Sequence, residues 1–284
     1  MLGRLKAVRK WQSLQAAFKH DGVLCVHGAL DEKARALAES AYHWSLANPG
    51  PGAREVLAGA LGAFYQDHAN PDAFSIYRPL LCETGLAQLV ADIMGSKALW
   101  LLYEQIWLKE GDEKRPTPWH QDLAYVPMTG DHIATLWLNL DPVAKEDSLE
   151  FVRKSHVGQL FNPTAFDAED ASAAMFEPGL WPPLPDVERN RDAFDIVSWA
   201  IAPGDIVVFH PCILHGGAAT RSGGRRRTMS LRFFGDHAYC AARPETGVAE
   251  IDRLKRAESS DPIEQLAFAE PGTLFRHPAF HRLV

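Results

Sequence analysis

The chain has few cysteines, and none of them are paired at the spacing of a zinc knuckle or a compact disulfide framework. Its four cysteines (Cys25, Cys82, Cys212 and Cys240) are scattered over 284 residues without a CxxC motif, so we expect reduced thiols. No apolar run approaches the ~18 residues of a membrane span. The basic N-terminus is not followed by the apolar segment of a signal peptide. These absences predict a cytoplasmic protein without a membrane partner.

An excess of positive charge is also missing. Lysine and arginine number 29 against 36 acidic residues, and the net charge of −7 disfavours nucleic acid or an anionic membrane as a partner. The one basic run is Arg225-Arg226-Arg227, in which we assign Arg225 and Arg227 to a solvated face. A small-molecule substrate remains as the expected partner, and the sequence does not indicate an oligomeric state.

The order of predicted elements indicates one mixed domain. Apolar residues at helical spacing predict helices over 5–18, 32–44 and 84–94, with Asp31 and Thr84 as N-caps of the last two. Short apolar segments between turn residues predict strands over 23–26, 99–109, 133–140, 149–152, 206–209 and 228–234. Helices followed by strands predict an α+β, mainly β, fold: a jelly roll with helices packed on one side.

We divide this single domain, residues 1–284, into four parts. Residues 1–98 are mainly helical, residues 99–158 and 203–236 form the jelly-roll core, and residues 237–284 form a C-terminal extension. Residues 159–202 interrupt the core with five prolines, several acids and large aromatic side chains. Long insertions of this kind are often active-site lids, so we expect this one to cover a substrate.

Two histidines and one carboxylate have the spacing of a metal site. His120 and Asp122 are two residues apart and would point to the same face of an extended segment. His215 follows roughly ninety-five residues later, beside two glycines that let a ligand approach. This ligand set is that of mononuclear iron(II) centres that keep positions open for small molecules. His210 is the alternative third ligand, and a core position at a strand end is its other role.

Arg226 is a candidate carboxylate receptor, because it lies eleven residues after His215 and shares a face with Thr228. The guanidinium supplies a two-pronged hydrogen bond and the hydroxyl a further donor. The combination predicts an oxygenase that uses iron(II), dioxygen and a dicarboxylic keto acid. Two alternatives stay open: a zinc-dependent hydrolase, for which no general base is evident, and a non-catalytic metal- or ligand-binding β-sandwich.

Four stretches, in this order, resemble the phytanoyl-CoA dioxygenase family: FKHDGVLCVHGAL at 18–30, WHQDLAYVP at 119–127, APGDIVVFH at 202–210 and HGGAATRSGGRRRTMS at 215–230. The members of that family are iron(II)- and 2-oxoglutarate-dependent oxygenases built on a double-stranded β-helix. The resemblance extends from residue 18 to residue 234. It implies the same jelly-roll, cupin-like fold and the same cofactors here.

The resemblance also implies residue roles. His120, Asp122 and His215 would bind iron, and Arg226 would hold the far carboxylate of 2-oxoglutarate. Further residues would lie beside the cosubstrate, with core packing as their alternative role: Gln105, Thr135 and Trp137. Because related halogenases lack the carboxylate that Asp122 supplies, the expected reaction is hydroxylation of an unactivated C–H bond, with conversion of 2-oxoglutarate to succinate and CO2. Desaturation or rearrangement would use the same ligands.

One segment departs from the family's pattern. Members commonly carry Asn-Gly and then Pro-Gly-Ser-His after the central strand, whereas this chain has Glu146-Asp147-Ser148 and later Arg153-Lys154-Ser155-His156. Both glycines are missing. We therefore expect a different turn geometry there and an intact metal site.

Overall fold

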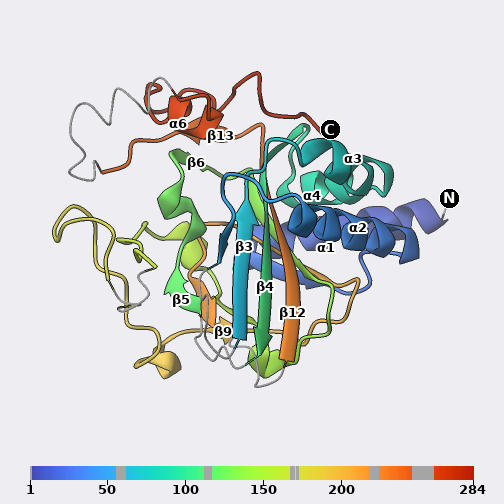
Figure 1. Ribbon diagram of the computed structural model, residues 1–284. Helices are drawn as coiled ribbons and strands as arrows, with labels where there is room; N and C mark the ends of the chain where they lie inside the picture. Colours follow the sequence, from blue (N-terminus) through green and yellow to red (C-terminus); the bar gives the residue numbers. More distant parts are fainter. Residues whose placement is uncertain are drawn as a thin grey trace.

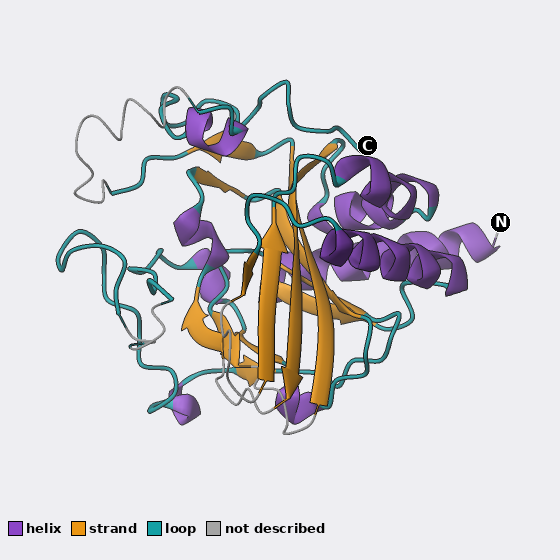
Figure 2. Cartoon of the chain, viewed as in Figure 1, coloured by secondary structure: helices purple, strands orange, loops and turns teal. Residues whose placement is uncertain are grey.

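The architecture is a pair of antiparallel sheets with helices on one side (Figures 1 and 2). The computed structural model describes residues 2–55, 62–111, 117–166, 170, 173–217, 224–244 and 259–284. The larger sheet has seven strands in the order β1 (Val23–Val26), β10 (Ile206–Phe209), β7 (Ile133–Asn139), β12 (Gly224–Gly235), β4 (Leu99–Gly111), β3 (Gly62–His68) and β2 (Arg54–Glu55). The smaller sheet has the order β5 (Thr117–His120), β11 (His215–Gly217), β8 (Leu149–Val152) and β9 (Ile196–Val197). The predicted jelly-roll core with helices on one side is confirmed.

The helices that cover the larger sheet are α1 (Leu2–Asp21), α2 (Glu32–Ala47), α3 (Phe74–Glu83) and α4 (Leu86–Met94). Asp31 caps α2 as predicted, because its side chain accepts a hydrogen bond from the amide of Ala34 at 2.8 Å. Thr84 does not cap α4. It ends the unforeseen helix α3, where its hydroxyl donates to the carbonyl of Leu80, and Gly85 precedes α4 in a left-handed conformation. Within the described part of the chain, no helix is both long and apolar enough to cross a bilayer.

The two faces of the larger sheet have different roles. Along β12, Met229, Leu231 and Phe233 pack into the apolar core beneath the helices. The alternate residues therefore face the space between the two sheets, and this polar row comprises Arg226, Thr228, Ser230 and Arg232. The larger apolar cluster thus lies on the helix side of the sheet, and the opposite side combines this polar row with a smaller apolar cluster.

Two strands in the N-terminal third were not predicted. β3 pairs with β4 along its whole length, and the short β2 adds an outer edge to it. The segment GAFYQDH mixes apolar and polar residues without a long apolar run, which explains why periodicity did not indicate a strand. After β4, residues 112–116 lie outside the described part, and the chain continues with β5 from Thr117.

The insertion at 159–202 runs along the side of the molecule away from the helices, drawn in yellow in Figure 1. Its residues 162–166 and 173–176 lie side by side, and we call them the lid stem. Backbone hydrogen bonds join the two halves, from Ala165 to Ala173 and from Met175 to Pro163, each 2.8 Å long. Asn162 adds a pair of side-chain hydrogen bonds to the backbone of Phe176.

At the top of Figure 1, a C-terminal layer contacts the end of the sheets. It contains the pair β13 (Ala238–Cys240) and β6 (Met128–Gly130), together with the short helix α6 (Pro262–Leu266). Phe275 and Phe280 pack against Phe234 and close an apolar cluster there. The last residues return to β4, where the amide of Leu283 donates to the carbonyl of Leu99.

Candidate metal centre

The two predicted histidine ligands face each other across the smaller sheet. His215 in β11 is in register with His120 at the end of β5, and their ring centroids are 4.2 Å apart. Gln121 is extended (φ −123°, ψ 117°), so Asp122, which begins a 3-10 helix at Asp122–Tyr125, points to the same side as His120. The Nε2 atoms of His120 and His215 lie 3.4 Å and 3.7 Å from Oδ1 of Asp122. The three side chains meet as the sequence predicted.

Each imidazole is oriented by a backbone carbonyl behind it. Nδ1 of His120 donates to the carbonyl of Pro118 at 2.7 Å, and Nδ1 of His215 donates to that of Ile213 at 3.0 Å. A carbonyl partner assigns the proton to Nδ1, which leaves the Nε2 lone pair free to bind a metal. Burial, reinforced by the nearby His120, lowers the pKa of His215 to about 3. His215 is therefore neutral, as a metal ligand must be, at physiological pH.

Asp122 is ionised and held from the opposite side. Burial alone would raise the pKa of this carboxyl, but the charge of Arg232 and the two imidazoles outweigh burial and hold the pKa well below its ordinary value. Oδ2 accepts hydrogen bonds from Oγ1 of Thr135 and Nη2 of Arg232, both at 3.3 Å. The site thus lies between the sheets. Two imidazole nitrogens and one carboxylate oxygen, all within 4.8 Å of one another, fit a single first-row divalent metal.

Arg226 lies in the interior face of β12 and is only 7% exposed. Its Nη1 donates to the carbonyl of Asp147 at 2.9 Å. Burial lowers the pKa of Arg226 to about 10, against the opposing charge of Asp147, so the guanidinium stays cationic at neutral pH. The hydroxyl of Thr228 donates to Oδ1 of Asn139 at 2.7 Å. Turning the Asn139 amide over would let its nitrogen donate to Thr228 and would free that hydroxyl proton for an anion.

The remaining predicted cosubstrate residues lie on the same face, in different surroundings. Ser230 in β12 stands between Trp137 of β7 and Gln105 of β4 in the strand register. Trp137 is buried in an apolar cluster that includes Phe151 of the smaller sheet. Thr135 contacts the carboxylate of the metal site. A role for these residues in holding the cosubstrate stays a prediction.

The alternative ligand His210 is a core residue. Its Nε2 donates to the carbonyl of Gly130 at 3.0 Å, its Nδ1 accepts from the amide of Cys212 at 3.2 Å, and burial lowers its pKa to about 4.

The assignment of Arg227 to a solvated face was wrong. Its side chain is only 12% exposed and pairs with Asp141 at 2.8 Å and with Glu39 of α2, because strand alternation turns it toward the helices. Arg225 is exposed as predicted.

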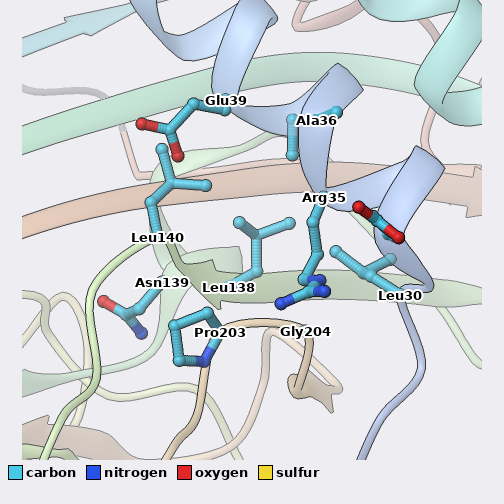
Figure 3. A pocket seen from close by; sticks show the side chains of 11 residues that line it. Leu30, Arg35, Ala36, Glu39, Leu138, Asn139, Leu140, Pro203 and Gly204 are labelled. Carbon is cyan, nitrogen blue, oxygen red and sulfur yellow. The ribbon is translucent and has the colours of Figure 1, made fainter.

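A hollow beside the larger sheet lies on the face that carries the helices (Figure 3). A cavity of about 300 Å³ lies between the start of α2, the end of β7 and the turn that precedes β10, and Arg35 extends toward Pro203 and Gly204 in that turn. Leu138 lines it from the helix side of β7, whereas Trp137 beside it in sequence faces the smaller sheet. This cavity is therefore separated from the metal centre by the sheet itself.

Comparison with known proteins identifies the family. The family model described as phytanoyl-CoA dioxygenase (PhyH) matches residues 18–228, which is most of the chain. The chain belongs to the phytanoyl-CoA dioxygenase family. This result confirms the resemblance drawn from the four sequence stretches.

Individual members are distant from this one. A probable phytanoyl-CoA dioxygenase of Caenorhabditis elegans is 26% identical over 159 residues, which are 54% of this chain and 48% of that protein. The peroxisomal phytanoyl-CoA dioxygenase of Homo sapiens is 27% identical over 118 residues, 41% of this chain and 32% of that protein. The chain thus spans about half and about a third of these relatives.

Among solved structures, the epimerase SnoN, in a complex with Fe3+, alpha ketoglutarate and nogalamycin RO, is similar over 97% of this chain and 99% of its own. The TM-score is 0.67 and the identity 23%, so the similarity supports the fold.

The departure from the family's glycine pattern has a local solution. Lys154 adopts a left-handed backbone conformation (φ 68°, ψ −1°), which glycine adopts without strain. The next residue, Ser155, donates its hydroxyl to the carbonyl of Val152 at 2.7 Å and accepts from the amide of Leu214 at 2.8 Å. The turn therefore forms without glycine, and its serine ties β8 to the segment that leads into His215.

Two residues beside the metal ligands, Gln121 and Arg232, were not predicted from the sequence. Gln121, between the ligands, is 1% exposed; its amide donates to the carbonyls of Cys212 at 2.7 Å and Gln159 at 3.2 Å, and its oxygen accepts from the amide of Phe161 at 2.9 Å. It links the metal strand to the insertion, and nothing in a HxD triplet indicates this role. Arg232 also escaped, although its even spacing from Arg226 was a usable signal.

The lid stem reaches the metal ligands. The Phe166 ring lies edge-on to His120, with 5.0 Å between ring centroids, and 5.6 Å from the ring of Tyr125. Tyr125 donates its hydroxyl to the carbonyl of Thr164 at 2.7 Å. Phe166 is 48% exposed and has a positive φ of 51°, an uncommon conformation for a bulky side chain. Strain of this kind tends to persist where a function depends on it.

Proposed function

We propose that this member of the phytanoyl-CoA dioxygenase family is an iron(II)- and 2-oxoglutarate-dependent oxygenase that hydroxylates an unactivated C–H bond of a small organic molecule. The observation that carries the proposal is the convergence of Nε2 of His120, Nε2 of His215 and Oδ1 of Asp122 between the two sheets. Membership of the family supports the same cofactors, and SnoN holds Fe3+ and alpha ketoglutarate on a similar fold.

Arg226 would hold the far carboxylate of 2-oxoglutarate. The guanidinium is buried, cationic and on the face of β12 that looks toward the smaller sheet. Its fork matches a carboxylate, and Thr228 on the same face would add a hydroxyl donor. Fixing one end of the cosubstrate orients its keto acid end, which is catalysis by positioning. Trp137 and Gln105, which flank Ser230 in register, would line the same space.

Iron and 2-oxoglutarate, when bound, would supply the oxidising power for the reaction with dioxygen. The chain itself supplies two buried imidazoles and an ionised carboxylate between the two sheets. His120 and His215 keep their protons on Nδ1 through the carbonyls of Pro118 and Ile213, so their lone pairs need no proton transfer before a metal binds.

The insertion supports an apolar primary substrate. Phe166 stands over His120, and Met175 of the lid stem and Leu180 just beyond it are 44% and 51% exposed. An insertion with several exposed apolar side chains offers a surface for an apolar molecule. A small organic molecule that buries apolar surface against Phe166 would place its reactive carbon beside the metal ligands.

The test is spectroscopic and needs no known substrate. Anaerobic addition of Fe(II) and 2-oxoglutarate to the purified protein should produce a weak visible charge-transfer band. The band should disappear in His215→Ala and persist in His210→Asn, which changes the other histidine of that region. A folded, metal-loaded protein without the band would contradict the proposal. Succinate release, screened across classes of apolar substrates, would then identify the molecule oxidised, and the mass of its product would separate hydroxylation from rearrangement.

A zinc-dependent hydrolase is the competing use of the same ligands. A hydrolase would have no use for the buried Arg226. This alternative predicts that the zinc-loaded protein hydrolyses a substrate and does not respond to 2-oxoglutarate. Calorimetric titration of the zinc-loaded protein with 2-oxoglutarate distinguishes the two, because the oxygenase site binds the keto acid and a hydrolase site would not.

A further inference from the structure

Arg232 is a buried cation beside the metal ligands that the proposed function does not use. It follows Arg226 by six residues on the same face of β12 and is 9% exposed. Its guanidinium stacks over the ring of Tyr103, 4.8 Å from the ring centroid. Nη2 donates to Oδ2 of Asp122, and Nη1 is buried without a hydrogen-bond partner among the described residues.

The two oxygens of Asp122 have separate surroundings. Oδ1 faces the Nε2 atoms of His120 and His215, at 3.4 Å and 3.7 Å. Oδ2 faces the larger sheet, where Arg232 and Thr135 each donate to it at 3.3 Å. One oxygen is therefore directed to the metal position, and the other is fixed from behind.

The contact between Arg232 and Asp122 does not have the form of a stabilising ion pair. An arginine that only pairs with a carboxylate usually binds both of its oxygens with two parallel hydrogen bonds. Here a single guanidinium nitrogen reaches a single oxygen, and the second nitrogen stays unused inside the protein. A buried donor without a partner costs free energy. The observed single hydrogen bond to Oδ2 is thus weaker than a two-pronged pair would be, but it leaves Oδ1 of Asp122 free to bind a metal.

We propose that Arg232 is the positioning residue of the metal carboxylate: with help from Thr135, it holds Asp122 as a one-oxygen ligand. This inference rests on the proposed function, because it assumes a divalent metal between the two histidines and Asp122. A carboxylate held at Oδ2 cannot turn to offer both oxygens to the ion. Arg232 thereby keeps a coordination position available for small molecules.

The experiment uses Co(II), whose visible spectrum reports the number and type of its ligands. Arg232→Met should bind Co(II) about 10–100-fold more weakly, the usual effect of losing a group that orients a metal ligand. Its Co(II) spectrum should also change, because Asp122 becomes free to bind through both oxygens. Arg232→Lys, which keeps the charge, should recover most of the affinity. Thr135→Val removes the other donor and should produce a smaller change in the same direction.

Arg276→Met is the matched control. Arg276 also stacks on an aromatic ring, 4.0 Å from the centroid of Trp100, and donates to the carbonyl of Gly235 at 2.9 Å, without contact with the metal ligands. Its variant should lose thermal stability and keep the wild-type Co(II) affinity and spectrum. If Arg232→Met keeps the wild-type Co(II) affinity and spectrum, this inference alone is overturned. If Arg232→Met does not fold, the same result in Thr135→Val overturns it. A wild-type protein that binds no divalent ion would overturn the proposed function with it.

Discussion

His215 lies directly opposite His120 in the antiparallel pairing of β11 with β5, and this register brings two imidazoles from distant parts of the chain within 4.2 Å of each other. Neither ligand position exists until the smaller sheet has formed. A metal bound there would stabilise the folded state and not the unfolded one, so metal affinity and the folding of this sheet are linked.

Arg226→Met should weaken binding of 2-oxoglutarate by about 2–5 kcal/mol, the scale for removing one member of a buried charge pair. Divalent metal binding should be unaffected, because Arg226 contacts Asp147 and none of the three ligands in this structure. Calorimetric titration of the Co(II)-loaded protein measures both quantities. Arg225→Met changes the exposed neighbour on the opposite face and should leave the dissociation constant as it was. Equal constants for all three proteins would show that another residue holds the cosubstrate.

Gln121→Leu should lower the free energy of unfolding by about 2–4 kcal/mol, because three backbone groups lose the buried Gln121 amide as their partner. Amide exchange at Phe161 should accelerate, since that amide donates to the Gln121 oxygen. Urea denaturation and hydrogen exchange report the two effects. The exposed Gln88, which donates to Asp92 on α4, offers a comparison: Gln88→Leu should change stability only slightly. Unaltered exchange at Phe161 in Gln121→Leu would refute the link to the insertion.

Lys154→Gly should stabilise the protein by about 0.5–1 kcal/mol. The left-handed conformation costs a non-glycine residue roughly 1–2 kcal/mol, and the greater freedom of glycine in the unfolded chain takes back part of that gain. Lys154→Ala removes the same side chain and keeps the strain, so it should produce no such gain. The urea denaturation midpoints of both variants and of the wild type measure this difference. Equal midpoints for Lys154→Gly and Lys154→Ala would show that the backbone at residue 154 is not strained.

Glu104 makes stability depend on pH. It lies 7% exposed on the helix side of β4, and burial raises its pKa from 4.5 to about 7, although the amide of Asn70 donates to it at 2.8 Å. The folded state holds this proton more tightly than the unfolded state does. The stability contribution is therefore complete below about pH 4.5, declines as pH rises and is lost above about pH 7, an effect of about 2–3 kcal/mol.

Glu104→Gln removes this titration and keeps a similar shape. Its stability relative to the wild type should increase by about 2–3 kcal/mol between pH 4.5 and pH 8, measured by urea denaturation at several pH values. Glu83→Gln, at an exposed position of α3, should follow the wild-type profile. Parallel profiles for Glu104→Gln and the wild type would disprove the buried proton.

The metal ligands could be predicted because their signals are local or lie within fixed motifs. An extended Gln121 is enough to place His120 and Asp122 on one side, and strand alternation is enough to turn Arg226 inward. The central strands could be predicted because they are short apolar runs. The glycines beside His215 favoured it over His210 as the third ligand, and the phytanoyl-CoA dioxygenase resemblance implied the same choice.

The errors share a physical reason, which is dependence on partners distant in sequence. Arg227 is buried because Glu39 and Asp141 meet it, and the residues around it do not indicate that. Thr84 has the chemistry of an N-cap, yet the preceding helix uses its hydroxyl first. Gln121 and Arg232 act through contacts with the insertion and with Asp122 that form only in the folded chain.

β12 is hydrogen-bonded along both edges, to β7 and to β4, and therefore has no freedom to slide. The insertion, in contrast, is held by the two-residue strand β9 at its far end and by side chains such as Gln121 and Tyr125. Substitutions in the insertion would therefore change which substrate binds, and the metal centre between the two sheets would keep its geometry.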